Sequence, residues 1–261
     1  MPEIQYADTE TTKILIEIAN LLKKYQAYET NGPLRLRRIG KDHDGGYVVA
    51  ELALEQADII MGFGIYDDSS FEEQASMIYG KRSYGFDGSV LLQQPAHKLF
   101  HFSPLFLISH EETKKIQGRY SNAASFDDMI QIFHLEEKKL FIKMDIERSE
   151  YTTMPDVLRH ASKITGITFE LHFGDDEDIP LALDLLKQIQ KDFFLIHVHG
   201  QNPCNRFSVS NVKGEIPRFL ELSYINKHLV KSAELAVNQR HPTPLDMPNN
   251  PKYPDIYFEI L

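Results

Sequence analysis

Residues 140–147, LFIKMDIE, decide the fold of this chain. A nearly continuous apolar run is typical of a central strand in a sheet that is covered on both faces. The run ends in two acids, Asp145 and Glu147, and open α/β sheets bind their ligands beyond the carboxyl ends of the strands. We therefore predict a buried strand here that delivers two carboxylates to a binding site.

The chain on either side of this strand alternates between apolar runs and segments with helical spacing. This alternation is typical of a parallel sheet with crossover helices. A further strand falls within residues 99–109, where Pro104 confines it to a sheet edge or splits it. The other strands are expected over residues 58–65, 83–87, 164–173, 193–200 and 218–225, and helices over residues 69–79, 125–133 with Ser125 as cap, and 178–191.

The two ends of the chain differ from this central pattern. Residues 9–28 carry apolar residues at helical spacing, which predicts an amphipathic helix within an N-terminal extension over residues 1–34. Such a helix either caps the sheet or joins two copies of the chain as a homo-oligomer. The main domain then covers residues 35–261. Residues 240–257 hold five of the 13 prolines, so we expect extended coil there.

The composition excludes several classes of protein. A chain of 261 residues that is 42% hydrophobic is long enough for one substantial core, and no apolar run reaches the about 20 residues of a spanning helix. A formal charge of −10 argues against non-specific binding to nucleic acid. Cys204 is the single cysteine, and the first residues lack the features of a signal peptide. We expect a cytoplasmic protein that neither inserts into a membrane nor binds nucleic acid.

Glycines and an acid follow the first two expected strands. Gly62, Phe63 and Gly64 come at the end of the first strand, and Asp87 comes at the end of the second. Glycines let a ligand approach the backbone, and an acid at the second position is placed to accept hydrogen bonds from a ribose diol. The pair favours a cofactor that carries a nucleoside.

Acids and histidines gather at the ends of the later strands. Residues two apart on a strand point the same way, so three pairs share a side: Asp145 with Glu147, Glu170 with His172, and His197 with His199. Carboxylates and imidazoles are ligands for divalent ions such as Mg, Mn, Fe or Zn. We predict Asp145, His172 and His199 as metal ligands and assign His197 to packing. The alternative is a polar rim whose residues bond to one another and to water.

Four stretches together resemble the FkbM-type S-adenosylmethionine-dependent methyltransferases. They are DGGYVV at residues 44–49, GFGIYDDSSFE at residues 62–72, KMDIERSEY at residues 143–151 and FELH at residues 169–172. The resemblance covers residues 37–173 and continues more faintly to residue 251. In one place the chain departs from the family pattern, because Arg148 stands where the family usually has glycine.

The resemblance implies a class I methyltransferase fold, a mostly parallel seven-stranded sheet with an antiparallel last strand, helices on both faces and a methyltransferase domain over residues 35–261. It implies that Gly62 and Gly64 line the cofactor, that Asp87 binds the ribose and that Asp145 lies between the methyl group and the acceptor. The turn of Asp44, Gly45 and Gly46 would supply further cofactor contacts.

The expected activity is O-methylation of a sugar hydroxyl with S-adenosyl-L-methionine as methyl donor. The acceptor would be a nucleotide-activated sugar or a surface-glycan precursor, with Asp145, His172 and Glu147 as catalytic residues and a divalent metal assisting. Two alternatives stay open. One is a metal-dependent hydrolase or lyase that acts on a sugar phosphate, and the other is a non-catalytic module that binds a nucleotide sugar.

Overall fold

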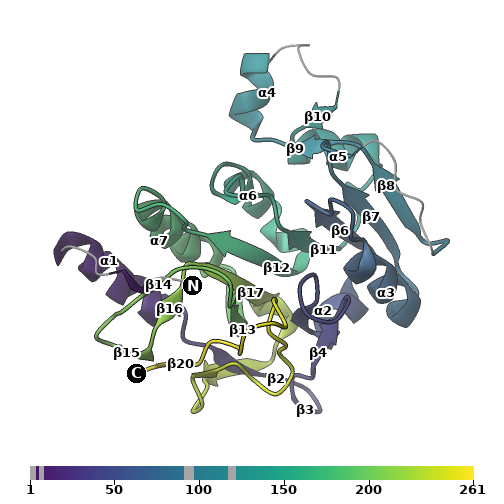
Figure 1. The fold of residues 1–261 in the computed structure, drawn as a ribbon. Coiled ribbons are helices and arrows are strands. Elements are labelled where there is room, and N and C mark those ends of the chain that lie inside the picture. The colour runs from purple at the N-terminus through teal and green to yellow at the C-terminus, as the bar shows by residue number, and fades with distance from the viewer. Residues whose placement is uncertain (1–3, 6–8, 91–96, 117–121) are drawn as a thin grey trace.

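A seven-stranded sheet forms the centre of the computed structural model, which describes residues 4–5, 9–90, 97–116 and 122–261 (Figure 1). The strand order is β13-β17-β12-β11-β6-β7-β8, and β17 runs antiparallel to both of its neighbours. The other pairs in the sheet are parallel. This arrangement confirms the predicted class I methyltransferase fold. The strands are β6 (Ile59–Phe63), β7 (Arg82–Phe86), β8 (Phe100–Ser103), β11 (Leu140–Met144), β12 (Ile164–His172), β13 (Phe193–Gly200) and β17 (Phe219–Asn226).

Helices cover both faces of the sheet, as Figure 1 shows. One face packs against α5 (Phe126–Ile132), α6 (Glu150–Leu158) and α7 (Asp178–Ile189), with α1 (Thr9–Leu21) beside α7. The other face packs against α2 (Glu51–Gln56), α3 (Ser70–Tyr79) and the hairpin of β4 (Leu36–Ile39) and β5 (Tyr47–Ala50). With apolar side chains on both faces, the central strands β6 and β11 are buried along their whole length.

The predicted N-terminal helix is too long. We expected a helix over residues 9–28, whereas α1 ends at Leu21 and the chain then forms strand β2 (Tyr25–Glu29). This strand pairs antiparallel with β18 (Ser232–Leu235), about two hundred residues further along the chain. Backbone hydrogen bonds to a distant partner therefore override the local helical spacing.

The expected coil near the C-terminus is present and packs across the sheet end. It runs between β19 (Arg240–His241) and β20 (Phe258–Ile260), which pair with each other. Short elements complete the described chain: β1 (Ile4–Gln5), β3 (Gly32–Pro33), β9 (Phe106–Leu107), α4 (His110–Ile116), β10 (Ala123–Ala124), η1 (Ala161–Lys163), β14 (Arg206–Phe207), β15 (Val212–Gly214), β16 (Ile216–Pro217) and η2 (Lys227–Leu229).

Two local predictions are confirmed by the structure. Pro104 separates β8, at the edge of the central sheet, from β9, which pairs with β10 instead. Ser125 caps α5 in a reciprocal capping box with Asp128. In the described part of the chain, no helix is long and apolar enough to cross a membrane.

Candidate active site

Two cavities open at the carboxyl ends of β6, β7 and β11, and they share Gly64 and Asp145. We call the first, of about 260 Å³, the apolar cavity; its lining includes Phe63, Phe86, Asp87, Leu105, Phe106 and Leu107. We call the second, of about 150 Å³, the charged cavity; its lining includes Lys41, Asp44, Tyr47, Asp67, Asp68 and Lys143. This is the place where ligands bind in open α/β sheets.

Gly64 stands at the junction of the two cavities and has to be glycine. Its φ is +71°, and a Cβ there would lie 1.6 Å from the carbonyl oxygen of Asp145. Phe63 lines the apolar cavity, as expected of a cofactor contact. Gly62 lines neither cavity, because its Cβ position is filled by the side chain of Glu72, with Oε1 at 1.8 Å. Gly62 is therefore required for packing against α3.

Asp87 is held in a fixed orientation at the mouth of the apolar cavity. Its Oδ2 accepts a hydrogen bond from the backbone N–H of Tyr66 at 2.8 Å. Its Oδ1 accepts from the backbone N–H of Ser89 at 2.8 Å and from the hydroxyl of Ser89 at 2.5 Å. A carboxylate offers about four acceptor positions, so Asp87 keeps one, on Oδ2, for a hydroxyl donor of a ligand. The stacked rings of Phe63 and Phe86, 5.2 Å apart, lie in the same lining.

The turn of Asp44, Gly45 and Gly46 only partly reaches a cavity. Asp44 and Gly45 line the charged cavity. Gly46 does not; a Cβ there would lie 2.5 Å from Nη2 of Arg38, so this glycine allows the guanidinium to pack on the backbone. Lys41 forms an ion pair with Asp68 at 3.0 Å across the charged cavity lining.

Asp145, Glu147 and His172 form a group that suits a divalent metal ion. One ligand atom from each lies within 4.8 Å of the others among the described residues. Nε2 of His172 is 3.9 Å from Oδ1 of Asp145 and 3.7 Å from Oε2 of Glu147. A cation between these atoms would need only small side-chain movements to reach coordinating distances.

A second carboxylate orients the imidazole of this group. Nδ1 of His172 lies 2.6 Å from Oε1 of Glu150, which is fully buried in the first turn of α6. A hydrogen bond from the far nitrogen to a carboxylate is the usual support for a metal-ligating histidine. The residues present therefore fit a metal ion, which would bind Asp145, Glu147 and Nε2 of His172 and would lower the pKa of a coordinated hydroxyl.

The electrostatics of the group favour a positive charge at its centre. Burial lowers the pKa of His172, but the hydrogen bonds and charges of Glu150 and Glu170 outweigh burial and raise it to about 11. Burial raises the pKa of Asp145, against the lowering effect of Lys143 and His172. Burial, followed by the charge of Asp145, raises the pKa of Glu170 to about 7. The buried carboxyl groups here require a compensating positive charge, which the His172 imidazolium and Lys143 supply.

Arg148, where the resemblance led us to expect glycine, has a backbone conformation that favours glycine. Glu147 and Arg148 both have positive φ, 52° and 76°, a region that favours glycine. Arg148 adopts it while forming ion pairs with Asp175 at 2.6 Å and Asp178 at 2.7 Å. The left-handed turn presents Glu147 to His172, so the strain lies directly at the candidate metal site.

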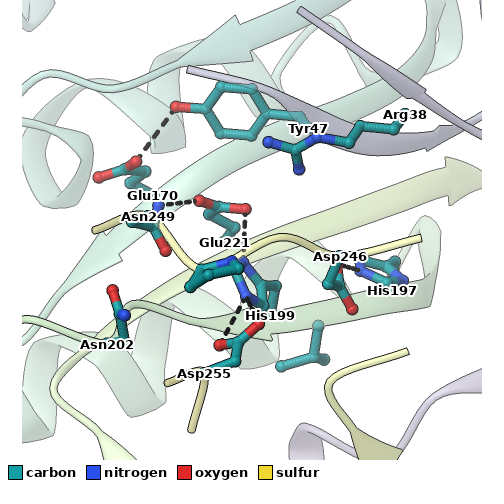
Figure 2. Close-up of polar contacts among 12 residues, drawn as sticks. Arg38, Tyr47, Glu170, His197, His199, Asn202, Glu221, Asp246, Asn249 and Asp255 are labelled. Atoms are coloured by element: carbon teal, nitrogen blue, oxygen red, sulfur yellow. Dashed lines mark hydrogen bonds and ion pairs between the residues drawn. The ribbon is translucent and has the colours of Figure 1, made fainter. Parts of the chain in front are cut away.

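His199 is not part of the Asp145, Glu147 and His172 group and lies in a second cluster, with Glu221 and Asp255 (Figure 2). Its Nδ1 is 3.0 Å from Oε2 of Glu221, and its Nε2 is 3.1 Å from Asp255. Burial lowers the pKa of His199, but these two carboxylates raise it to about 10. The structure therefore places this predicted metal ligand as a charged link between the sheet and the C-terminal coil. His197 binds the same coil through Asp246, at 2.8 Å, in agreement with its assignment to packing.

Several residues that support the site were missed in the sequence. Tyr47 binds acids at the candidate metal site, because its hydroxyl donates to Glu170 at 3.2 Å (Figure 2) and lies 3.5 Å from Asp145. Lys143 and Glu150 were given no role either. Lys143 carried a signal, since it is a charged residue in an otherwise apolar strand. Glu150 and Tyr47 lie in the stretches that carry the family resemblance, but the sequence did not show what they bind, because their partners are distant in the chain.

Comparison with known proteins does not assign the chain to a family. No protein-family model matches the chain, and no curated protein matches it. Among solved structures, the chain is similar to a crystal structure of a fibrillarin/Nop5p complex, at 10% sequence identity and a TM-score of 0.34, over 77% of this chain and 97% of the other. A likeness this distant carries no argument about activity. The strand order, with β17 antiparallel to its neighbours, gives this chain the Rossmann-like α/β fold of class I methyltransferases.

Proposed function

We propose that this protein is an S-adenosylmethionine-dependent methyltransferase. The observation that carries the proposal is that two cavities of different chemistry meet at Gly64 and Asp145. The apolar cavity, with Asp87 at its mouth, suits adenosine and its ribose diol. The charged cavity, with lysines and aspartates, suits the ammonium and carboxylate of an amino acid. Asp145 then lies beside the sulfur that joins these two halves.

The acceptor that we propose is a sugar hydroxyl, on a nucleotide-activated sugar or a surface-glycan precursor. Methyl transfer forms an O–C bond and breaks an S–C bond, and the hydroxyl proton must leave. A sugar hydroxyl is barely ionised at neutral pH, so a base or a metal ion is needed; a positioned base contributes about 10²–10⁴-fold. The Asp145, Glu147 and His172 group supports this proposal, because it lies next to the shared wall of the two cavities.

Each residue of the group has a distinct task in this proposal. Asp145 lines both cavities, so it is the carboxylate placed to receive the hydroxyl proton or to share the metal ion with the acceptor oxygen. His172 and Glu147 would supply the other two ligands of the ion. A bound divalent ion would stabilise the negative charge that develops on the acceptor oxygen.

Calorimetry with S-adenosylhomocysteine and with Mn²⁺, separately and together, tests the proposal. We expect saturable binding of both, followed by methyl transfer from labelled S-adenosylmethionine to members of a nucleotide-sugar panel. Binding of Mn²⁺ with no binding of S-adenosylhomocysteine would refute methyl transfer and support a metal-dependent hydrolase. Binding of both without transfer to any member of the panel would leave the sugar acceptor unsupported.

A further inference from the structure

Glu72 is a fully buried acid directly behind the charged cavity. It lies in the first turn of α3 and has 0% exposure. Among the described residues, neither oxygen of its carboxylate has a hydrogen-bond partner. An ionised carboxylate in such a place is unfavourable unless a nearby charge compensates for it. Glu72 lines neither cavity and does not belong to the candidate metal group.

Glu72 and Lys143 are neighbours through Gly62, which contacts the Glu72 carboxylate and pairs with Lys143 in the sheet. The carboxylate of Glu72 occupies the space where a side chain at Gly62 would lie, with Oε1 at 1.8 Å from that Cβ position. Gly62 pairs with Lys143 in the parallel register of β6 and β11. Paired residues of a parallel sheet point to the same face, so the Lys143 side chain lies on the same face as the Glu72 carboxylate.

The charges around Glu72 agree with this geometry. Burial raises the pKa of Glu72, the charge of Lys143 opposes the rise, and the resulting pKa is about 7. Asp68 from the preceding loop and Glu73 from α3 are the other charged groups that face it, and both raise its pKa. Burial therefore disfavours the ionised form of Glu72, and the Lys143 ammonium is the neighbouring charge that favours it.

Lys143 is the cation of the charged cavity that is free to bind a ligand carboxylate. It is 5% exposed, lines the cavity and donates a hydrogen bond to the carbonyl oxygen of Gly64 at 3.2 Å. Within the described ranges, it forms no ion pair with a carboxylate oxygen within 4.0 Å. Lys41, the other lysine of the lining, is already paired with Asp68.

We infer that Glu72 is a positioning residue that controls how much of the Lys143 charge is available to the carboxylate of the bound amino-acid moiety. The inference rests on the proposed function. When Glu72 is protonated, the Lys143 ammonium is available to a ligand carboxylate in the charged cavity. When Glu72 is ionised, it competes with that ligand carboxylate for the ammonium. When a ligand carboxylate pairs with Lys143, Glu72 loses its compensating charge and takes up a proton. The affinity for the ligand should therefore fall as the pH rises through neutrality.

Calorimetry with S-adenosylhomocysteine between pH 6 and pH 8 tests this inference. For the wild type, we expect the dissociation constant to rise about 3- to 10-fold over this range, the result of a pKa shift of up to about one unit. Titrations in two buffers of different ionisation enthalpy should show fractional proton uptake on binding. The Glu72→Gln variant, which keeps the shape of the side chain, should hold the affinity seen at pH 6 throughout and lose the proton uptake. Glu137→Gln, at an exposed glutamate that does not act on the pKa of Glu72, is the matched control and should keep the wild-type profile.

A second variant guards against a purely structural effect. Lys143→Met should weaken binding at every pH. It should also remove the pH dependence, because Glu72 and the ligand carboxylate then have no ammonium to compete for. A Glu72→Gln profile that matches the wild type in slope and proton uptake would overturn the inference. Binding by the wild type with no pH dependence would overturn it while leaving the proposed function intact. If the wild type binds no S-adenosylhomocysteine at any pH, the proposed function and this inference fail together.

Discussion

His172 and Glu150 form a buried pair in which Nδ1 of the imidazole lies 2.6 Å from Oε1 of the carboxylate. His172 is the last residue of β12, and Glu150 is the first residue of α6. Because Nδ1 is bonded to Glu150, Nε2 faces Asp145, Glu147 and Glu170, with Oε2 of Glu170 the nearest at 3.3 Å. The pair therefore links the end of one strand to the helix that follows the neighbouring strand, and it holds the candidate metal site in one orientation.

Replacing Glu150 by Gln should weaken Mn²⁺ binding without removing a ligand. The amide keeps the shape and a hydrogen bond, but it removes the negative charge that makes the imidazole a better ligand. We expect about 10-fold weaker binding, at the lower end of the 10- to 100-fold range for such supporting residues. Calorimetry with Mn²⁺ measures it, and Glu147→Gln, which removes a ligand itself, gives the comparison. Equal affinity in the Glu150→Gln variant and the wild type would contradict the supporting role.

Asp145→Asn and His172→Ala should abolish methyl transfer while leaving the fold intact. The two variants differ in their effect on the cofactor, because Asp145 lines both cavities and His172 lines neither. We expect the affinity of His172→Ala for S-adenosylhomocysteine to stay within about threefold of the wild type, whereas its Mn²⁺ binding is lost. Thermal unfolding checks folding. Wild-type turnover in both variants would remove the catalytic assignment.

Asp87→Asn should reduce the affinity for S-adenosylhomocysteine. Hydrogen bonds to a charged group contribute about 1.5–3 kcal/mol, so we expect binding about 10- to 100-fold weaker. Ser89→Ala is the matched control. It removes a hydrogen bond that orients Asp87 but leaves the carboxylate, so its effect should be less than about threefold. An Asp87→Asn affinity equal to that of Ser89→Ala would argue against a ribose at this position.

Arg148→Gly should be more stable than Arg148→Ala. Both variants lose the ion pairs with Asp175 and Asp178, but only alanine keeps a side chain at the positive φ of 76°. We expect a difference in unfolding free energy of about 1 kcal/mol in favour of glycine. Denaturant unfolding of the two variants measures it. The reverse order would show that the backbone at this position is not strained.

The link between His199 and the C-terminal coil should make stability depend on pH. The pKa of His199 is about 10 in the folded protein, above the about 6.5 of an unfolded histidine. A raised pKa contributes stability that is complete below the unfolded pKa and is lost as the pH rises through the folded pKa. His199→Gln should therefore lower the free energy of unfolding most near pH 6.5, by about 3–5 kcal/mol. The difference in unfolding free energy between variant and wild type should decrease toward pH 10.

Denaturant unfolding from pH 6.5 to pH 10 measures the difference in unfolding free energy between His199→Gln and the wild type. His228→Gln, at an exposed histidine, serves as the control and should show a constant, small difference. A His199→Gln difference that stays constant from pH 6.5 to pH 10 would mean that the imidazolium does not hold the coil.

Local patterns predicted the central sheet well because each of its strands is defined by its own residues. The apolar run of residues 140–144 forms a strand wherever it is covered on both faces, and Ser125 caps its helix with Asp128, three residues away. The helical spacing of residues 9–28 predicted too long a helix, because the last part of this segment forms a strand that depends on a distant partner. The strand Tyr25–Glu29 exists because of a partner at Ser232–Leu235, which the local sequence does not contain.

In the candidate site, too, some residues were predictable from the local sequence and others depend on contacts with distant segments. Asp145, Glu147 and His172 were predictable as a group, because the ends of neighbouring parallel strands meet at one edge of the sheet. His199 satisfied the same rule but joined Asp255 and Glu221, because a proline-rich coil from the end of the chain packs over it.

The amino-acid sequence by itself thus determined the order of strands and helices, the acids at the strand ends and the glycine at the cavity junction, all of which depend on neighbours in the chain. Only the tertiary structure decided which of those polar groups meet. The partners of His172, His199 and Glu72 come from other elements, and their distances follow from how helices and coil pack on the sheet.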